Sequence, residues 1–442
     1  MTALESLYEL YQQHPLVTTD SRDCPAGSIF FALKGDTFDG NLFAARALEQ
    51  GCAAAVVDNP EVAVDGRYVV VPSVLETLQQ LAAMHRLRWG KTVLQITGTN
   101  GKTTTKELVS AVLSQAHRVL YTQGNLNNHI GVPRTLLRLA PEHDIAVVET
   151  GASHPGEIRF LCSLVHADYG LITNVGRAHL LGFGSFEGVK RTKGELYDDL
   201  SQRGKQIFLN AQDDDLCQMA RERGLEPGRQ AIPYVEAKVE SCSPFLAIQW
   251  REAGDKPWHR VQTHLIGAYN IANLRAAITV GLHFGVTPAQ VDQALAAYQP
   301  TNSRSEFRQT ERNRLVVDAY NANPSSMSAA LTAFASVEAP DKMVILGDMG
   351  ELGAESRSEH LRVLDQLQGM HLAQAWLVGS EFAAALAEWQ AGHPGMEVAA
   401  QCHTFASEPQ VEEHLAAHPL AGHTILVKGS NSTHLFRLPA LL

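Results

Sequence analysis

The clearest local signal in this sequence is Ile96-Thr97-Gly98-Thr99-Asn100-Gly101-Lys102-Thr103-Thr104-Thr105. Apolar residues at positions 93, 94 and 96 precede the glycines, as in a short strand. After the glycines, apolar residues recur at the spacing of an α-helix, at positions 108, 109, 112 and 113. A strand, a glycine-rich loop and a helix in this order are typical of a phosphate-binding P-loop.

The residue types in this loop suit phosphate chemistry. Gly98 and Gly101 allow backbone N–H groups to converge on phosphate oxygens, where a Cβ would collide. The helix that follows adds the unpaired donors and the positive dipole of its N-terminus. Lys102 supplies a cation for the outer phosphates, and Thr103 supplies a hydroxyl for Mg²⁺. In the pattern G-x-x-x-x-G-K-[ST] the first glycine would fall at Ile96, so this is a shortened relative. A glycine turn without phosphate chemistry is the alternative.

Composition sets broad limits on the function. A chain of 442 residues is long enough for roughly two to four domains. The net charge of −11 argues against nucleic acid or an anionic membrane as a partner. The six cysteines include no C-x-x-C pair, which favours neither a zinc site nor a disulfide framework. The N-terminus has no basic leader pattern, and no apolar run approaches about 18 residues. We therefore expect a reduced, cytoplasmic protein without a membrane span.

The apolar runs predict an α/β protein with three domains. Residues 1–85 form a small α/β domain in this prediction. Residues 86–300 alternate helical segments with strands, which predicts a mostly parallel sheet covered on both faces, with strands near 92–96, 144–149, 170–174 and 206–210. Residues 301–442 repeat the alternation and predict a Rossmann-like domain, with strands near 314–318, 343–346, 375–378 and 424–427. This last domain lacks G-x-G-x-x-G, so dinucleotide binding is not expected.

Polar residues beyond the predicted strand ends are candidates for chemistry. Glu149 follows four apolar residues, where an acid reaches Mg²⁺ directly or through water, although it also suits a helix cap. His179 lies in a glycine-rich turn, where it either faces the phosphates or is structural. Lys193 follows fourteen residues later, and the helical pattern alone places it on a surface.

The first predicted domain holds a separate group of candidates. Ser21, Arg22 and Lys34 flank predicted strand ends. Such residues grip an anionic ligand or lie in a solvated turn with surface charges. The pattern alone favours neither interpretation.

Several motifs occur together in this chain and in one order. They are the loop at 98–105, Gly-Asn-Leu-Asn-Asn at 124–128, Glu-Thr-Gly-Ala at 149–152, the spacing from His179 to Lys193, Gly-Ala-Tyr-Asn-Ile-Ala-Asn at 267–273, and Asp-Ala-Tyr-Asn-Ala-Asn at 318–323. In this combination the chain resembles the Mur ligases, across all three predicted domains. The resemblance implies an ATP-dependent ligase that forms a C–N peptide bond in cytoplasmic peptidoglycan precursor synthesis.

The resemblance also implies roles for individual residues. The ATP site would comprise Gly98, Thr99, Asn100, Gly101, Lys102, Thr103 and Thr104, with Asn270 and Asn273 near the adenine, Arg304 at the γ-phosphate and Asp318 at the ribose. One Mg²⁺ ion would bind Thr103 and Glu149. A second Mg²⁺ would bind Glu149, His179 and Lys193, the last carbamylated by CO₂. The catalytic residues would be Lys102, Glu149, His179, Lys193 and Arg304.

The implied substrates are UDP-N-acetylmuramoyl-tripeptide and D-alanyl-D-alanine. The first domain would hold the uridine-diphosphate end through Ser21, Arg22 and Lys34, and a central loop would hold the muramoyl part through Asn125, Asn127 and Asn128. The last domain would close on ATP and bind the dipeptide through Tyr320, Asn321, Asn323, Ser326, Lys428 and Ser430. The resemblance further implies a monomer without a nucleic-acid partner.

Alternatives to this function remain open on sequence grounds. They are a sibling ligase that adds a single amino acid, a folylpolyglutamate-type enzyme, and a P-loop NTPase that acts as a switch. Asp20-Ser21-Arg22 and the asparagine-rich loop at 125–128 argue against the folate enzyme. Leu-Gly-Asp-Met-Gly-Glu-Leu-Gly at 346–353 and the absence of an Asp-Asn-Pro-Arg-like motif favour the dipeptide-adding type. Whether the tripeptide ends in lysine or diaminopimelate stays open.

Overall fold

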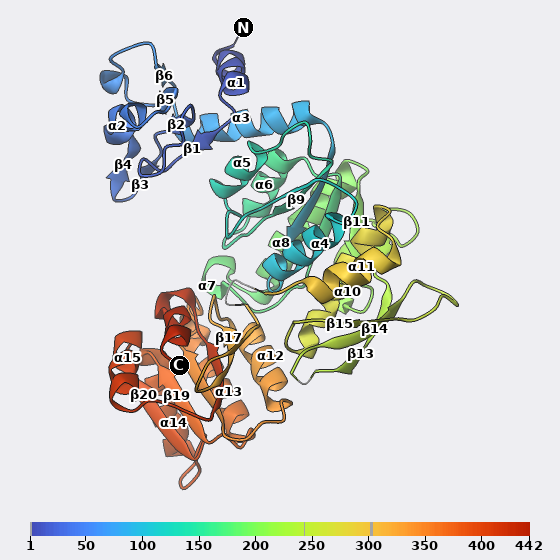
Figure 1. Ribbon diagram of the computed structural model, residues 1–442, viewed down its shortest axis with the longest axis vertical. Helices are drawn as coiled ribbons and strands as arrows, with labels where there is room; N and C mark the ends of the chain where they lie inside the picture. The colour runs from blue at the N-terminus through green and yellow to red at the C-terminus, as the bar shows by residue number, and fades with distance from the viewer. Residues whose placement is uncertain (1, 243, 301–303) are drawn as a thin grey trace.

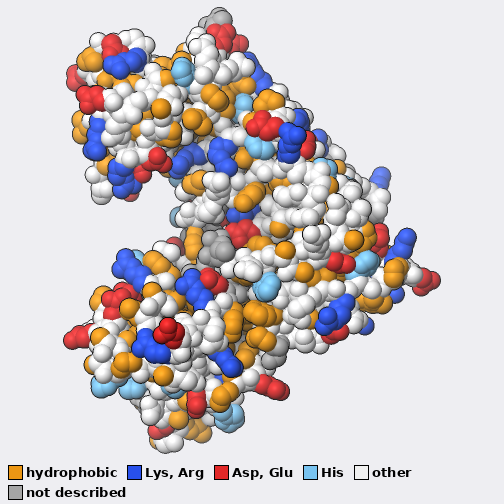
Figure 2. All heavy atoms as spheres, in the orientation of Figure 1, with side chains coloured by type: hydrophobic (Ala, Val, Ile, Leu, Met, Phe, Trp, Pro, Cys, Tyr) orange, Lys and Arg blue, Asp and Glu red, His pale blue; other side chains and the backbone are white. Residues whose placement is uncertain are grey.

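In the computed structural model, which describes residues 2–242, 244–300 and 304–442, the chain folds into three successive α/β units (Figure 1). We call them the N-terminal, central and C-terminal domains. Boundaries at residues 85 and 300 remain predictions, and the predicted start of the last domain at residue 301 lies outside the described residues. The N- and C-terminal domains lie on the same side of the central domain, and Figure 2 shows a hollow open between them.

The N-terminal domain is a small parallel sheet between helices. Its strands run in the order β1-β2-β5-β6, and all pairs are parallel. Ile29 and Phe31 of β2 pack on the side of α1 and α3, whereas Phe30 packs on the side of α2. The elements are α1 (Ala3–Gln13), β1 (Val17–Thr18), β2 (Ile29–Phe31), the antiparallel pair β3 (Lys34–Gly35) and β4 (Phe38–Asp39), α2 (Ala44–Glu49), β5 (Ala54–Val57), β6 (Tyr68–Val70) and α3 (Val74–Trp89).

The central domain is built on a six-stranded parallel sheet of order β12-β11-β10-β7-β9-β8. Its strands are β7 (Thr92–Thr97), β8 (Val119–Tyr121), β9 (Ile145–Glu149), β10 (Tyr169–Ile172), β11 (Gln206–Leu209) and β12 (Ala231–Pro233). Its helices are α4 (Lys102–Leu113), α5 (Gly131–Leu136), α6 (Glu157–Val165), α7 (Leu180–Phe183), α8 (Phe186–Gln202), α9 (Asp214–Arg221), α10 (Ile271–His283) and α11 (Pro288–Ala297).

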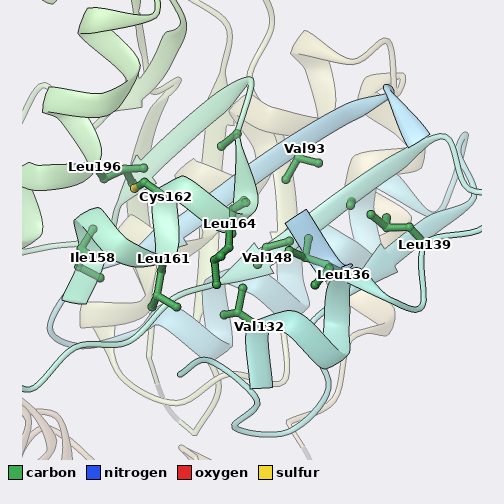
Figure 3. Close-up of a cluster of buried hydrophobic side chains, with 14 of the residues drawn as sticks. Val93, Val132, Leu136, Leu139, Val148, Ile158, Leu161, Cys162, Leu164 and Leu196 are labelled. Atoms are coloured by element: carbon green, nitrogen blue, oxygen red, sulfur yellow. The ribbon is translucent and has the colours of Figure 1, made fainter. Parts of the chain in front are cut away.

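Both faces of this sheet are buried, as the sequence predicts. Val93 and Val148 point into a core with α5 and α6 (Figure 3). Their neighbours Leu94 and Val147 point to the opposite face, into a core with α4 and α10. Because the residues on both faces of each strand are buried, the strands appear in the sequence as near-continuous apolar runs.

Strand β10 ends two residues earlier than predicted; Thr173 still donates its N–H to Thr97 at the end of β7, but the next contacts are with the glycine-rich loop. Thr173 Oγ1 donates to the backbone oxygen of Asn100 at 2.7 Å. The backbone N–H of Asn100 donates to Asn174 Oδ1 at 3.0 Å. The loop after β7 is therefore held in place by the residues that follow the adjacent strand.

A three-stranded antiparallel sheet in the central domain was not predicted. It comprises β13 (Glu236–Ser241), β14 (Ala247–Arg251) and β15 (His259–Gln262). Five of the six residues of β13 are exposed and none is buried, so this strand lacks the apolar alternation that marks a strand in sequence.

The C-terminal domain has a six-stranded sheet of order β16-β17-β21-β18-β19-β20, in which only the β16–β17 pair is antiparallel. Its elements are β16 (Glu306–Gln309), β17 (Arg314–Asp318), α12 (Pro324–Ala335), β18 (Lys342–Gly347), α13 (Ser356–Gln368), β19 (Gln374–Val378), α14 (Ser380–Gly392), β20 (Gln401–Phe405), α15 (Glu408–Ala417) and β21 (Thr424–Lys428). The four predicted strands lie where expected. The edge strands β16 and β20 were missed because few of their residues are buried. None of the helices in the described part of the chain is both long and apolar enough to span a membrane.

Candidate active site

The glycine-rich loop joins β7 to α4, as predicted. Gly98 has a φ of 143°, and a Cβ at this position would lie 2.0 Å from Thr173 Oγ1. Gly101 has a φ of 75°, and a Cβ there would lie 2.7 Å from Asn273 Oδ1. Both the backbone conformation and the lack of space require glycine. The N–H groups of Thr99 and Asn100 already donate to Asn174, so the backbone donors left for a ligand are those at the N-terminus of α4.

Lys102 is the first residue of α4 and folds over the loop. Its Nζ donates to the backbone oxygens of Gly98 and Thr99, both at 2.8 Å. Burial lowers the pKa of Lys102 to about 8, a shift that Glu149 opposes and Arg304 reinforces. An anion bound beside two such cations would favour the protonated amine. The site is therefore suited to phosphate groups.

Glu149 is the last residue of β9 and is 1% exposed. Its Oε1 accepts hydrogen bonds from Thr103 Oγ1 at 3.2 Å and from Asn127 Nδ2 at 2.8 Å. Its Oε2 has no hydrogen-bond partner among the described residues. A buried carboxylate oxygen without a partner is costly unless a cation binds it. Carboxylate and hydroxyl oxygens are ligands that Mg²⁺ prefers, so Thr103 and Glu149 fit this ion.

His179 lies where the central domain meets the C-terminal domain. Its Nδ1 is in hydrogen-bonding contact with the carboxylate of Glu351. Burial lowers the pKa of His179, and the charge of Glu351 opposes this shift. Across residues 2–242, 244–300 and 304–442, no group of three or more His, Cys, Asp or Glu residues is placed to hold a metal ion. The second Mg²⁺ site at Glu149, His179 and Lys193 therefore stays a prediction.

Lys193 is buried in α8, although the helical pattern alone places it on a surface. Its side chain donates from Nζ to the backbone oxygen of Ala152 at 3.3 Å, and the residue is 2% exposed. Burial lowers the pKa of Lys193 well below its usual range, and the charge of Lys102 adds to this shift. A neutral amine is the form that attacks CO₂. Burial thus favours the neutral form that carbamylation requires, whereas the carbamate itself stays a prediction.

One cavity of about 1030 Å³ collects most of the predicted site residues. It extends from the central domain to the C-terminal domain. Gly98, Lys193 and Ser430 are absent from its lining. Ser430 Oγ accepts the Gly350 N–H at 2.9 Å and so fixes the loop after β18. The predicted residues that line the cavity are Thr99, Asn100, Gly101, Lys102, Thr103, Thr104, Asn125, Asn127, Asn128, Glu149, His179, Asn270, Asn273, Arg304, Asp318, Tyr320, Asn321, Asn323, Ser326 and Lys428.

Residues of the C-terminal domain reach the phosphate loop directly. Asn323, the N-cap residue of α12, donates from Nδ2 to Asn100 Oδ1 at 2.8 Å. The Arg304 guanidinium carbon lies 3.8 Å from the ring centroid of Tyr320, and Arg304 Nε has no partner among the described residues. An arginine stacked on an aromatic ring, with a free donor beside Lys102, suits a phosphate or carboxylate group.

Asp318 and Lys428 form an ion pair at the end of the C-terminal sheet. Lys428 is 1% exposed, and its Nζ donates to Asp318 Oδ2 at 2.6 Å. The other oxygen of Asp318 accepts the Ser305 N–H at 3.2 Å. Lys428 therefore orients the carboxylate that is predicted to bind the ribose. Its predicted contact with the dipeptide stays a prediction.

We expect the variant Lys428→Met to lower the local stability of this sheet by about 3 kcal/mol, because it leaves Asp318 as an unpaired charge. Adding Asp318→Asn should recover part of the loss, since the stranded charge is then removed. Hydrogen exchange of β17 and β21 at increasing urea concentrations would measure both effects. Equal protection in wild type and Lys428→Met would contradict the expectation.

The residues predicted to hold uridine diphosphate lie outside the cavity. Arg22 pairs with Asp20 at 2.7 Å, and its side chain is 83% exposed. Lys34 pairs with Asp58 at 2.8 Å. Ser21 belongs to the same turn as Arg22. Arg22 and Lys34 are thus each oriented by an ion pair with an aspartate of the N-terminal domain. Binding of a diphosphate by Ser21, Arg22 and Lys34 stays a prediction.

Some residues of the cavity had no role in the sequence analysis. Phe160 and Leu161 of α6 line it, although helical periodicity gives them only a packing role. Tyr269 lies within the quoted run 267–273, and its hydroxyl lies 2.6 Å from Ser305 Oγ. Glu351 contacts His179 but does not itself line the cavity; it lies within the quoted run 346–353, from which only the ligase type was inferred. Tyr269 and Glu351 thus lie in motifs that the sequence does reveal. Their contacts were missed because their partners, Ser305 and His179, are remote in sequence.

The P-loop, the acid at the end of β9 and the shared cavity define a nucleotide-dependent class of protein. Three family models match this chain: "Mur ligase family, catalytic domain" over residues 15–86, "Mur ligase middle domain" over residues 96–281, and "Mur ligase, glutamate ligase domain" over residues 303–431. The chain belongs to the Mur ligase family.

Individual relatives are similar over most of the chain. The UDP-N-acetylmuramoyl-tripeptide–D-alanyl-D-alanine ligase of Escherichia coli K12 is 36% identical over 83% of this chain and 81% of its own length. The crystal structure of MurF from Acinetobacter baumannii superposes with a TM-score of 0.83 at 31% identity, over 98% of this chain and 97% of that one. The crystal structure of MurF from Thermotoga maritima in complex with ADP superposes with a TM-score of 0.80 at 25% identity, over 100% of this chain and 98% of that one.

Proposed function

We propose that this chain is an ATP-dependent ligase that joins D-alanyl-D-alanine to UDP-N-acetylmuramoyl-tripeptide by a peptide bond, in peptidoglycan precursor synthesis. The observation that carries the proposal is the cavity that joins the phosphate loop and Glu149 to residues of the C-terminal domain. Such a cavity suits a reaction in which a phosphoryl group is transferred beside the place where an amine is captured. The names of the relatives supply the substrates.

The reaction has two chemical steps in this proposal. The carboxylate of the tripeptide attacks the γ-phosphorus of ATP, which gives an acyl phosphate and ADP. The amine of the dipeptide then attacks the acyl carbon, and phosphate leaves. No side chain is required as a covalent nucleophile, so the protein acts by positioning and by charge stabilisation.

The residues of the cavity meet the electrostatic demand of the first step. Two anions, a carboxylate and a triphosphate, must approach each other. Lys102 and Arg304 offset this charge, while the loop amides and the N-terminus of α4 hold the phosphates. Mg²⁺, for which Thr103 and Glu149 are suited, would add charge stabilisation when bound.

Phosphate release tests the proposal directly. The chain is incubated with ATP, Mg²⁺ and UDP-N-acetylmuramoyl-tripeptide in three parallel reactions. The first contains D-alanyl-D-alanine, the second a single amino acid and the third no amine. We expect phosphate and a pentapeptide product, identified by mass spectrometry, only with the dipeptide. Release with a single amino acid would indicate a sibling ligase. Release that is indifferent to both co-substrates would indicate an NTPase.

We also propose that the chain acts as a cytoplasmic monomer. The ATP and the UDP-linked precursor that the ligase would use are cytoplasmic metabolites, and the family resemblance implies a monomer. Light scattering under assay conditions should give a mass near 48.1 kDa. A mass of twice this value would contradict the monomer.

A further inference from the structure

His179 and Glu351 meet across the contact between the central and C-terminal domains. The carboxylate of Glu351 contacts His179 Nδ1, and the backbone oxygen of Glu351 accepts the Leu181 N–H at 3.3 Å. Both His179 and Glu351 have left-handed backbones, with φ of 52° and 61°. Non-glycine residues adopt this conformation only where their surroundings enforce it, and such residues cluster at functional sites.

The contact leaves one ring nitrogen of His179 available. Nδ1 contacts Glu351, whereas Nε2 has no hydrogen bond to any described residue. His179 lines the same cavity as Glu149 and Thr103. Histidines that bind metal ions generally donate their other ring N–H to a carboxylate, which fixes the tautomer and the orientation of the ring. Glu351 occupies the position of that carboxylate.

We infer that Glu351 is a positioning residue for the Mg²⁺ site, supplied to His179 by the C-terminal domain. The inference rests on the proposed function and on the role of Mg²⁺ ligand that the resemblance to the family implies for His179. It adds that the orientation of His179 depends on docking of the C-terminal domain, since the residue that orients its ring belongs to that domain. The loop that carries Glu351 would thus couple domain arrangement to metal binding.

The loops on both sides of this contact are held firmly. The Arg177 N–H donates to Ser325 Oγ at 3.2 Å, so the segment before His179 is bonded to the start of α12. The Gly350 N–H donates to Ser430 Oγ at 2.9 Å, so the residue before Glu351 is bonded to the segment after β21. A carboxylate on an anchored loop can fix a ring orientation, which a free surface side chain does not do.

An ordinary surface ion pair is the competing explanation, because the Glu351 side chain is 61% exposed and exposed pairs contribute little. The chain offers a matched control for it. Glu355 lies four residues away and pairs with Arg177 at 3.2 Å across the same domain contact, with its side chain 44% exposed. A role in domain contact alone predicts similar effects at Glu351 and Glu355.

Manganese binding tests the inference without relying on turnover. Mn²⁺ serves as the probe, bound with the β,γ-imido analogue of ATP and measured by electron paramagnetic resonance. Glu351→Gln should weaken the binding of Mn²⁺ by about 10- to 100-fold, the usual effect of removing such a carboxylate. Glu355→Gln should change it by less than about twofold.

Two further variants keep the test decisive. Glu351→Gly removes the carboxylate but suits the left-handed backbone, so it should weaken Mn²⁺ binding equally while the melting temperature stays at or above that of wild type. In a His179→Gln background, Glu351→Gln should have no further effect on Mn²⁺ binding, because the ring that it orients is gone.

The outcomes separate this inference from the proposed function. Equal Mn²⁺ binding in Glu351→Gln and Glu355→Gln would overturn the inference, as would Mn²⁺ binding that is unchanged in His179→Gln. Failure of the wild-type chain to form the pentapeptide would overturn the proposed function instead. Ligation by wild type with unaltered Mn²⁺ binding in Glu351→Gln would leave the function standing and remove only the role of Glu351.

Discussion

Lys102→Ala should reduce kcat by about 10²-fold or more, the typical loss when one preorganised stabilising group is removed from a site. The amine is at the start of α4, held at 2.8 Å from the backbone oxygens of Gly98 and Thr99. It therefore adds charge stabilisation without reorganisation when the carboxylate approaches the triphosphate. Phosphate release at saturating ATP, tripeptide precursor and dipeptide would measure the loss.

Two variants show whether charge is the cause. Lys102→Met keeps most of the side-chain length but removes the cation, so it should lose about as much activity as Lys102→Ala. Lys91→Ala removes a lysine just before β7, whose Nζ donates only to backbone oxygens of Pro141 and His143 among the described contacts. This control should retain activity to within about twofold, since it lies away from the cavity. An active Lys102→Ala enzyme would remove the basis for the phosphate site.

The strand, loop and helix around Gly98 and Gly101 were predictable because they depend on consecutive residues. The strand, the glycines, Lys102 and Thr103 follow one another within about a dozen positions, so their order alone predicts the loop, although Thr173 and Asn273 also require its glycines. Glu149 was found for a related reason: it ends a buried parallel strand, and the carboxyl ends of such strands share one edge. Periodicity and strand order thus sufficed for the central part of the site.

Contacts between domains were not predictable from patterns. Asn100 and Asn323 are hydrogen-bonded although they lie 223 positions apart. Nothing in the sequence near either residue shows which partner it meets, because packing of separately folded sheets decides this contact. The same holds for His179 and Glu351. Resemblance to a family supplied roles for single residues, but the contacts that connect those roles required the structure.

Burial of charged residues was the other source of error. A helical pattern distinguishes an apolar stripe from a polar face, and a lysine counts toward the polar face. Lys193 is nevertheless 2% exposed: its Nζ lies 5.4 Å from the ring centroid of Phe183 in α7 and donates to the backbone oxygen of Ala152. Charged residues are almost never fully buried without a partner or a function. A buried lysine on an otherwise ordinary helix therefore marks a site more clearly than its sequence pattern does.

Lys193→Ala is expected to abolish ligation, at roughly 10³-fold below wild type, and to recover part of the activity when a short carboxylate such as acetate or formate is added. In the proposed modification, the Lys193 amine attacks the carbon of CO₂ and loses a proton, which gives an N-linked carboxylate. The side chain would then carry an anionic oxygen ligand, which the family resemblance assigns to the second Mg²⁺. A small carboxylate has the same oxygens and fits the space that the shortened side chain leaves.

The helix itself supplies the control. Lys190 lies three residues earlier on α8, where its Nζ pairs with Asp215 at 2.9 Å. Lys190→Ala should remain active and should not respond to added carboxylate, because the cavity and Lys193 are untouched. Carbon-13 NMR of wild type under ¹³CO₂ should show a carbamate signal that is absent from Lys193→Ala and present in Lys190→Ala. Full activity of Lys193→Ala without any additive would show that neither the amine nor its carbamate is needed. Loss of activity without rescue or carbamate signal would leave Lys193 a buried structural lysine.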